Sequence, residues 1–246
     1  MRDLYVALAG FGAGLINGVA GGGTLLSFPV LLAVGLPAIQ ANVTSTIGIF
    51  PGYAGGVAGF RKEVVSQKDR LRQLAPVAIV GGIGGAVALL VTPSRSFSSV
   101  APYLILVSCG LFAAQPLLAK RLESAEGERR RWLLAQGGVL FACAYGSYFG
   151  AGLGVLLLAV LGITIPDSLA RSNGLRSVIS LAVNFIAAVV FVIAAHVEWT
   201  YAGTLAITSL VGGYVGARFA LKIPRQPLRI LIILIGLGAA AKLLAG

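Results

Sequence analysis

Residues 17–24, NGVAGGGT, place three consecutive glycines inside an apolar run that extends from Leu4 to Gly35. Glycine costs roughly 1 kcal/mol against alanine in a helix interior, so three together predict a break with exposed backbone. Inside a membrane, exposed backbone is tolerated only where it is buried in protein or lines a cavity. The stretch is therefore a candidate binding site, and the alternative is close helix packing through small residues.

The composition is that of a helical membrane protein. The 246 residues are 57% hydrophobic and 11% charged, against about 25% charged in a soluble domain. Uncharged runs long enough to cross a bilayer recur along the chain. The basic residues that give the net charge of +11 lie in short loops between these runs, as the positive-inside rule predicts. The charge therefore does not indicate a nucleic-acid-binding protein. We expect a multi-pass protein of the cell (inner or plasma) membrane, surrounded by the lipid bilayer.

Two apolar runs are too long for one straight span. The run at 4–35 would extend about 48 Å as a single helix, against a hydrocarbon core of about 30 Å. The run at 132–162 is also too long, and it is interrupted by GSYFGAGLG at 146–154. A re-entrant helical hairpin with a glycine tip fits each run.

The remaining runs predict two repeats, 1–119 and 132–246, joined by a basic cytoplasmic linker at 120–131. The first repeat has its hairpin at 4–35, a charged loop at 61–72, and spans at 39–60, 74–91 and 100–119. The second has its hairpin at 132–162 and spans at 170–195, 201–221 and 228–244. Gly81-Gly82 and Gly85 recur at one offset as Gly212-Gly213 and Gly216. Such a duplication with glycine breaks is typical of secondary transporters.

Charge counting separates two topologies. If the hairpins cross the membrane, the repeats are parallel and five basic residues face outward: Arg171, Arg176, Lys222, Arg225 and Arg229. If the hairpins are re-entrant, the repeats are inverted and only three basic residues lie outside: Arg2, Arg95 and Lys242. The second arrangement obeys the positive-inside rule. The predicted fold class is an all-α polytopic membrane protein of two inverted repeats, each a hairpin plus three transmembrane helices, with both termini outside.

In this arrangement the two tips meet near the membrane midplane. The returning arms, which begin at Thr24 and Val155, point their helix N-termini at the centre, where N–H donors and a partial positive charge favour an anion. Arg171 and Arg176 follow the second hairpin. A membrane arginine costs roughly 2.5 kcal/mol or more and marks a pathway or a partner, unless it extends to the interface.

Polar residues occupy the matching place in the first repeat, where Asn42 corresponds to Arg171 and Thr44 to Asn173. They could line the pathway or cap a broken helix. The candidate substrate-binding residues are Asn17, Gly21, Gly22, Gly23, Thr24, Asn42, Thr44, Ser45, Ser147, Gly150, Gly152, Arg171, Asn173 and Arg176.

The sequence offers no constellation for an enzyme. It has no Walker loop, no pair of metal ligands at helical spacing and a single histidine. The two cysteines, Cys109 and Cys143, lie in apolar runs and suggest neither a disulfide framework nor a metal site. We therefore expect no enzymatic activity, no cofactor and no bound metal.

Four segments resemble one family along nearly the whole chain. INGVAGGGTLLSFPVLLAVGLPAIQANVTST (16–46) resembles the signature of the sulfite exporter TauE/SafE family, also known for toluene-sulfonate uptake. YGSYFGAGLGVLLLAVLGI (145–163), DSLARSNGLRSVISLAVNFIAA (167–188) and VGGYVGARFALKIP (211–224) resemble its second half. The glycine motifs at 21–24 and 150–154 and the segment at 41–45 match the family pattern. The second tip, however, reads Gly-Ala-Gly-Leu-Gly rather than a glycine triplet. This departure puts equal roles for the two tips in doubt.

The resemblance implies a permease for sulfur-containing or organic anions. We expect a secondary transporter of a small anion, sulfite or an organosulfonate, bound between the tips. Protons are a candidate coupling ion. The expected fold is compatible with an oligomer. The alternatives are a channel-like anion pore of the same architecture and a non-transporting membrane scaffold subunit.

Overall fold

The computed structural model describes residues 1–19, 21–120, 128–165, 167–219 and 225–245. These residues form helices and no strands, which confirms the all-α prediction for the described chain. The helices are α1 (Arg2–Val19), α2 (Thr24–Ala33), α3 (Ala38–Gly59), α4 (Arg61–Val65), α5 (Lys68–Val91), α6 (Ser94–Lys120), α7 (Glu128–Phe149), α8 (Leu153–Thr164), α9 (Leu169–Ala194), α10 (Trp199–Phe219) and α11 (Arg225–Ala245).

Both long apolar runs break at left-handed glycines. Gly21 and Gly22 have φ angles of 78° and 104°, and Gly150 and Gly152 have φ angles of 75° and 90°. Residues with a Cβ atom rarely adopt this conformation, whereas glycine does so freely. The breaks therefore end α1 and α7 and allow α2 and α8 to start in new directions.

The helices on either side of each break fold back on one another. In the first hairpin, Gly23 lies against the backbone of Ala13, and Gly12 lies against the Leu26 side chain. In the second hairpin, Gly146 lies against Leu153, and further back along the arms the residues Gly138 and Val160 are in contact. Each pair of arms is thus an antiparallel helical hairpin.

The charged segment expected as a loop at 61–72 is mostly helical. It forms α4 and the first turn of α5, which begins at Lys68 rather than at the expected residue 74. Charge keeps such residues out of the hydrocarbon core but does not prevent them from forming a helix. Part of the expected linker at 120–131, namely 121–127, and the end of the expected span at 201–221 lie outside the described residues.

The two halves exchange partners. Helix α1 packs on α10 and α7 packs on α5; likewise α3 contacts α10 and α9 contacts α5, and α2 contacts α11 and α8 contacts α6. The two members of each pair of contacts are equivalent if the helices of the first half correspond in order to those of the second: α1 to α7, α2 to α8, α3 to α9, α5 to α10 and α6 to α11. Each hairpin is therefore packed against spans of the opposite half, and the halves are not separate units.

Glycines create the closest of these contacts. Gly81 and Gly85 of α5 face the backbone carbonyls of Leu140 and Ala144 on α7. Their counterparts on α10, Gly212 and Gly216, face in the same way the carbonyls of Phe11 and Leu15 on α1. Small residues allow helix backbones to approach closely in membranes.

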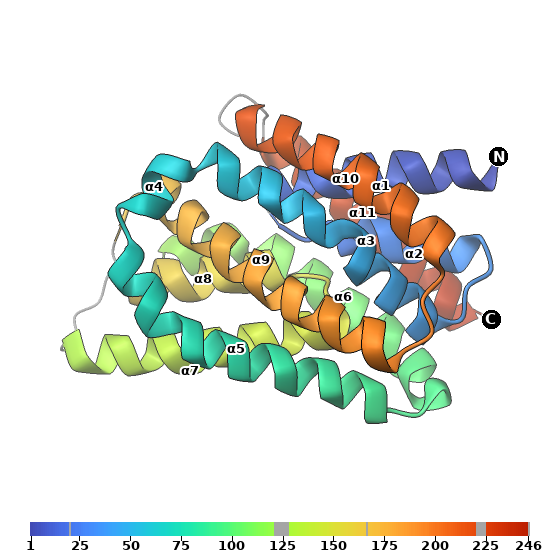
Figure 1. Ribbon diagram of the computed structural model, residues 1–246, viewed down its shortest axis with the longest axis horizontal. Coiled ribbons are helices and arrows are strands. Elements are labelled where there is room, and N and C mark those ends of the chain that lie inside the picture. The colour runs from blue at the N-terminus through green and yellow to red at the C-terminus, as the bar shows by residue number, and fades with distance from the viewer. Residues whose placement is uncertain (20, 121–127, 166, 220–224, 246) are drawn as a thin grey trace.

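The arrangement of helices gives the molecule two distinct ends (Figure 1). Both termini lie at one end, which we call the terminal end, and α4 lies at the opposite end, which we call the α4 end. Helices α3 and α9 run between these ends through the middle of the molecule and contact each other.

Large apolar side chains cover the outside of several helices. On α5 alone, Ile79, Val80, Ile83 and Val87 are exposed, while the opposite side of that helix is buried. Two helical segments, Lys68–Val91 and Ala170–Ala194, are long and apolar enough to cross a membrane. An apolar surface of this kind is unfavourable in water and suits contact with lipid.

Candidate functional site at the hairpin tips

The tips of the two hairpins touch in the interior. A Cβ atom on Gly21 would lie 2.6 Å from the Cα atom of Gly154, and one on Gly150 would lie 3.0 Å from Oγ1 of Thr24. All four residues are buried. Only glycine leaves room for this approach, and the contact therefore depends on the motifs that suggested the site.

Asn17 shapes the first tip. Its Oδ1 atom accepts hydrogen bonds from the backbone N–H groups of Gly22 (3.0 Å) and Gly23 (2.7 Å), just ahead of α2. The side chain is buried, and its Nδ2 atom has no hydrogen-bond partner among the described residues. A buried donor without a partner costs roughly 1–3 kcal/mol. A ligand that accepts a hydrogen bond from this amide would remove that cost.

Arg176 supplies the positive charge at the tips. It is the largest fully buried side chain of the described chain, 2% exposed. Its Nη2 atom donates to the backbone carbonyl of Asn17 (3.2 Å), and its Nη1 atom lies beside Gly21. A buried guanidinium is a strong binding group for planar oxyanions, because its N–H groups form a fixed fork.

Asn42 performs the matching task at the second tip. Its Nδ2 atom donates to the carbonyl of Tyr148, near the end of α7, at 2.9 Å. A carbonyl near the end of each outgoing arm is thus bound by a side chain from the opposite half: Arg176 serves α1, and Asn42 serves α7. These bonds offset part of the negative charge that the C-termini of α1 and α7 bring to the centre.

Other candidates in the first repeat make contacts within the fold. The hydroxyls of Ser45 and Ser27 lie 2.6 Å apart and join α3 to α2. Thr44 accepts a hydrogen bond from the backbone N–H of Glu198, ahead of α10 (3.1 Å). These contacts join the first part of α3 to the first hairpin and to the start of α10.

The remaining candidates of the second hairpin are also buried. Gly152 lies against Ser108 of α6, whose hydroxyl donates to the carbonyl of Ala151 at 3.0 Å. Ser147 is 2% exposed, and its hydroxyl has no hydrogen-bond partner among the described residues. It lies opposite Gly82 of α5 rather than at the Gly21–Gly154 contact.

Arg171 and Arg176 lie in different surroundings although both belong to α9. The side chain of Arg171 forms an ion pair with Asp167 (3.2 Å) and is 40% exposed. Asp167 also pairs with Arg70 of α5, and Gln67 donates to the backbone carbonyl of Arg171 at 2.9 Å. Arg171 therefore belongs to a charged network that connects the two halves at the α4 end.

The charge state of Asp167 follows from this network. Burial alone would raise its pKa, but hydrogen bonds from Arg70 and the Ser168 backbone, with the charge of Arg171, hold the pKa of the carboxyl below its usual value. The carboxylate is thus ionised at neutral pH and matched to two arginines.

The candidates Asn173 and Arg176 belong to a longer polar stripe along α9, whose other members were not predicted from the sequence. Asn173, Arg176, Ser177, Ser180 and Asn184 are all buried and lie on one side of the helix. Their spacing of three or four residues in an apolar run is a signal that periodicity alone could have revealed. The stripe extends the candidate site away from the tips.

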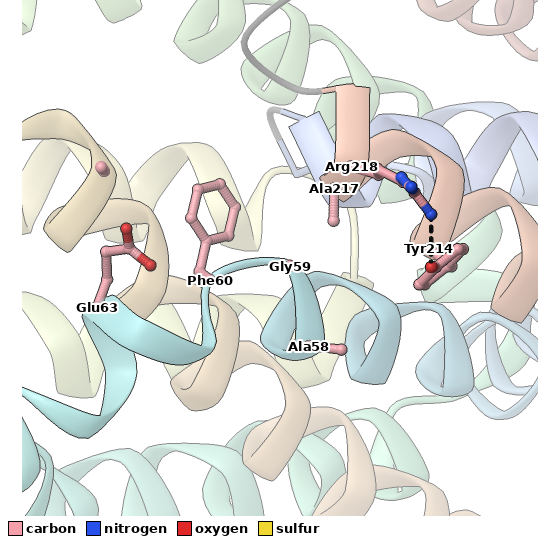
Figure 2. Close-up of a pocket in the computed structure, with 8 residues that line it drawn as sticks. Ala58, Gly59, Phe60, Glu63, Tyr214, Ala217 and Arg218 are labelled. Atoms are coloured by element: carbon pink, nitrogen blue, oxygen red, sulfur yellow. Dashed lines mark hydrogen bonds between the residues drawn. The ribbon is translucent and has the colours of Figure 1, made fainter.

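A pocket of about 410 Å³ opens at the α4 end (Figure 2). It lies between the α3–α4 junction and α10, and its lining includes Phe60, Glu63 and Arg218. Arg218 donates to the hydroxyl of Tyr214 at 3.0 Å. The pocket places groups of both charge signs at the surface near the start of α9.

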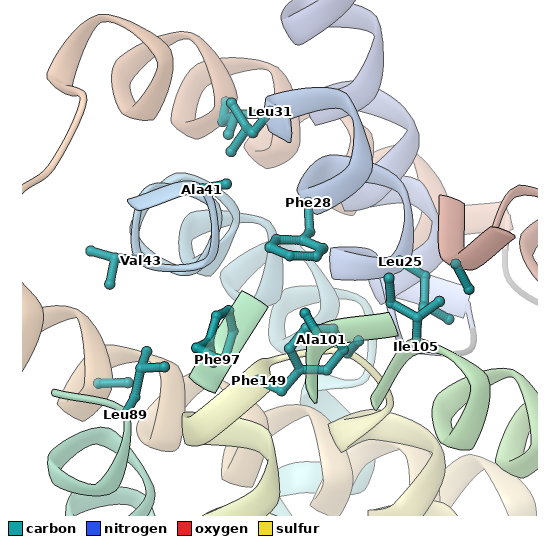
Figure 3. Packing of buried hydrophobic residues seen from close by; sticks show 14 of the residues in the cluster. Leu25, Phe28, Leu31, Ala41, Val43, Leu89, Phe97, Ala101, Ile105 and Phe149 are labelled. Atoms are coloured by element: carbon teal, nitrogen blue, oxygen red, sulfur yellow. The ribbon is translucent and has the colours of Figure 1, made fainter. Parts of the chain in front are cut away.

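Aromatic packing holds the second tip in place (Figure 3). Phe149, at the end of α7, packs edge-to-face on Phe28 of α2 with ring centroids 5.3 Å apart, and it also contacts Phe97 of α6. All three rings are buried. Because one cluster contacts both hairpins, it fixes their relative position.

Paired hairpins, capped at their tips by side chains of α9 and α3, and a buried arginine inside an apolar helical shell are features of a membrane transporter. Among the described residues, no group of three metal-ligating side chains is present. The chain belongs to the sulfite exporter TauE/SafE family, whose family model matches residues 6–243. This confirms the resemblance, and the family is one of membrane transporters rather than enzymes.

Several similar proteins carry a transporter description. The chain is 26% identical to the probable membrane transporter protein YfcA of Escherichia coli K12, over 94% of this chain and 86% of the relative. It is 22% identical to the probable membrane transporter protein ORF9 of a Sinorhizobium species, over 100% of this chain and 95% of the relative. A probable membrane transporter protein of Haemophilus influenzae is 25% identical, over 98% and 94%.

Proposed function

We propose that the protein is a secondary transporter of a small sulfur-containing anion, sulfite or an organosulfonate, which binds where the hairpin tips meet. The observation that carries this proposal is the pairing of two buried donors at one place. The guanidinium of Arg176 and the unpartnered Nδ2 amide of Asn17 both lie beside the first tip.

The second hairpin adds a further attraction for an anion. Helix α8 begins at Leu153, and its first residues meet Gly21 at the tip contact. The first N–H groups of a helix lack intrahelical partners and carry a partial positive charge. In α2 two comparable groups are occupied by Asn17, whereas the residue that caps α8 is Gly152, which has no side chain. We therefore place the anion nearer to α8.

The chemistry favours an oxyanion over a halide. A guanidinium binds two oxygens of one planar or tetrahedral group, and an amide N–H binds a third. Sulfite and sulfonates each present three oxygens on one sulfur atom. The family description points to the same class, since it names sulfite.

We further propose two inverted repeats in the cell membrane, with the α4 end in the cytoplasm. Basic residues of α4 and of the first turns of α5 and α9 gather at that end: Arg61, Lys62, Lys68, Arg70, Arg72 and Arg171. The terminal end has Arg2 and Lys242 near the termini and Arg95 at the start of α6. This asymmetry follows the positive-inside rule.

A binding screen tests the proposal. Purified protein in detergent is heated with sulfite, sulfate, thiosulfate, sulfoacetate or a small carboxylate, and the unfolding temperature is measured. Ligand at about 100 times its Kd should stabilise the fold by about 2.7 kcal/mol. We expect sulfite or sulfoacetate to stabilise the wild type and the Arg72→Ala control but not Arg176→Ala. Equal stabilisation of Arg176→Ala by these anions would show that Arg176 does not bind them.

A further inference from the structure

The pocket at the α4 end lies in line with the polar stripe of α9. Ala170, near the start of α9, lines the pocket. Asn173 and Ser177 follow at three and seven residues, which places them on the same side of the helix as Ala170, one and two turns deeper. Ser180 and Asn184 continue the same side further inward.

Helix α3 matches this stripe with small residues. Gly59 lines the pocket, and one turn deeper Gly56 faces Ser177, where a Cβ atom on the glycine would lie 3.5 Å from the serine Oγ. Another turn deeper is Tyr53, which is buried and within electrostatic range of Arg176. We call the contact between α3 residues 53–59 and α9 residues 170–184 the α3–α9 seam.

The hydroxyl groups of the seam are not explained by folding. Ser177 and Ser180 are 2% and 1% exposed, and their Oγ atoms have no hydrogen-bond partner in the described part of the chain. Each buried group without a partner costs roughly 1–3 kcal/mol. Alanine would avoid this cost and pack equally closely, so these serines point to a polar ligand.

We propose that the α3–α9 seam is the polar route by which the anion moves between the hairpin tips and the pocket at the α4 end. This inference rests on the proposed function. The α9 stripe carries hydroxyls, amides and one guanidinium and no carboxylate, a lining that favours an anion over a cation. The seam joins α3, which packs on α1 and α10, to α9, which packs on α5 and α7, so a small movement of these two groups of helices widens or closes it.

Cysteine labelling tests the route. In a background with Cys109 and Cys143 replaced by alanine, Ser177→Cys and Ser180→Cys are treated in sealed vesicles of each orientation. The probes are the anionic sulfonatoethyl methanethiosulfonate and its cationic trimethylammonium analogue. Val178→Cys is the matched control, because Val178 is adjacent to Ser177 but lines an apolar groove between α5 and α9.

The expected result is labelling of both seam cysteines from the α4 side only. The anionic reagent should react about tenfold or more faster than the cationic one, because a positively charged site concentrates anions. Seam cysteines that react no faster than Val178→Cys, in vesicles that still transport sulfite, would overturn the route and leave the proposed function intact. Labelling as expected in vesicles without any anion transport would instead contradict the proposed function.

Discussion

Two arginines five residues apart on α9 differ in what surrounds them. Arg171 has a carboxylate partner in Asp167 and is partly exposed, whereas Arg176 is buried beside Asn17 and Gly21. The sequence identified both as costly in a membrane and did not separate them. Asp167 lies only four residues before Arg171, so that pair is local. Asn17, beside Arg176, lies 159 positions away, and no local pattern could have shown which arginine reaches the tips.

The amide of Asn17 allows a test that leaves the tip intact. Asn17→Asp keeps an oxygen acceptor for the N–H groups of Gly22 and Gly23, and a negative charge at a helix N-terminus is favourable. The new carboxylate would, however, neutralise the charge of Arg176 and remove the Nδ2 donor. We expect sulfite binding to weaken at least about tenfold, or 1.4 kcal/mol, with an unchanged fold by circular dichroism. Gln73→Glu, an exposed change of equal charge, should bind as the wild type does.

Asp167 predicts a pH-dependent contribution to stability. Its pKa is lower in the folded protein than the usual 3.8, so its contribution is complete above pH 3.8 and is lost as the pH falls through the folded value. Asp167→Asn should cost about 1 kcal/mol at pH 7, or roughly 2–4 °C in unfolding temperature, and progressively less as the pH falls below 3.8.

The control for this measurement is Asp69→Asn. Asp69 is 90% exposed and only 3.8 Å from Arg72, an arrangement that contributes little in water. Its replacement should leave the unfolding temperature unchanged across the same pH range. An Asp167→Asn effect that does not shrink as the pH is lowered would show that the ion pairs are not its cause.

At the scale of elements, the hairpins depend on a few glycine positions. Gly21→Ala would force a Cβ atom into a left-handed residue, within 2.8 Å of Arg176 Nη1 and closer still to Gly154. Adopting that conformation costs a non-glycine residue roughly 1–2 kcal/mol, and the tips must also move apart. We expect sulfite transport to fall at least about tenfold, with a lower unfolding temperature.

The matched control is Gly84→Ala on α5. Nothing lies within 4 Å of a Cβ atom there, and alanine favours the helix by roughly 1 kcal/mol. Both variants add one methyl group, so only the position differs. Wild-type transport by Gly21→Ala would contradict a role for close contact between the tips.

The breaks in the helices could be predicted from sequence, because glycine triplets and excess length act locally. The identity of the capping groups could not. Asn42 binds a carbonyl of α7 and Arg176 one of α1, and each of these bonds joins residues more than 100 positions apart. Helix α4 was also missed, because a charged segment of five residues resembles a loop when only hydropathy is considered.

At the scale of the molecule, the exchange of partners between the halves was only partly foreseeable. The matching glycines of α5 and α10 indicated a duplication and close packing. Their partners, α7 and α1, come from the opposite half, and that choice follows from tertiary packing of all the helices together. Hydropathy sets which segments meet lipid but not which spans meet each other.

The position of the termini gives a test of the proposed topology. Both termini lie at the terminal end, opposite α4 (Figure 1). A cysteine added after Gly246, in a background without Cys109 and Cys143, should react with a membrane-impermeant maleimide on intact cells. Lys62→Cys on α4 should react only after the membrane is opened. The reverse pattern would place the α4 end outside the cell.

In the proposed function, Arg176 binds an anion which the protein carries across the membrane. Solute counterflow measures this directly: proteoliposomes loaded with unlabelled sulfite are diluted into a trace of radioactive sulfite. We predict that the wild type and Arg72→Ala transiently accumulate label above the outside concentration, which a pore cannot do, and that Arg176→Ala does not. Equilibration without accumulation would indicate a pore, and accumulation by Arg176→Ala equal to that of the wild type would contradict the account.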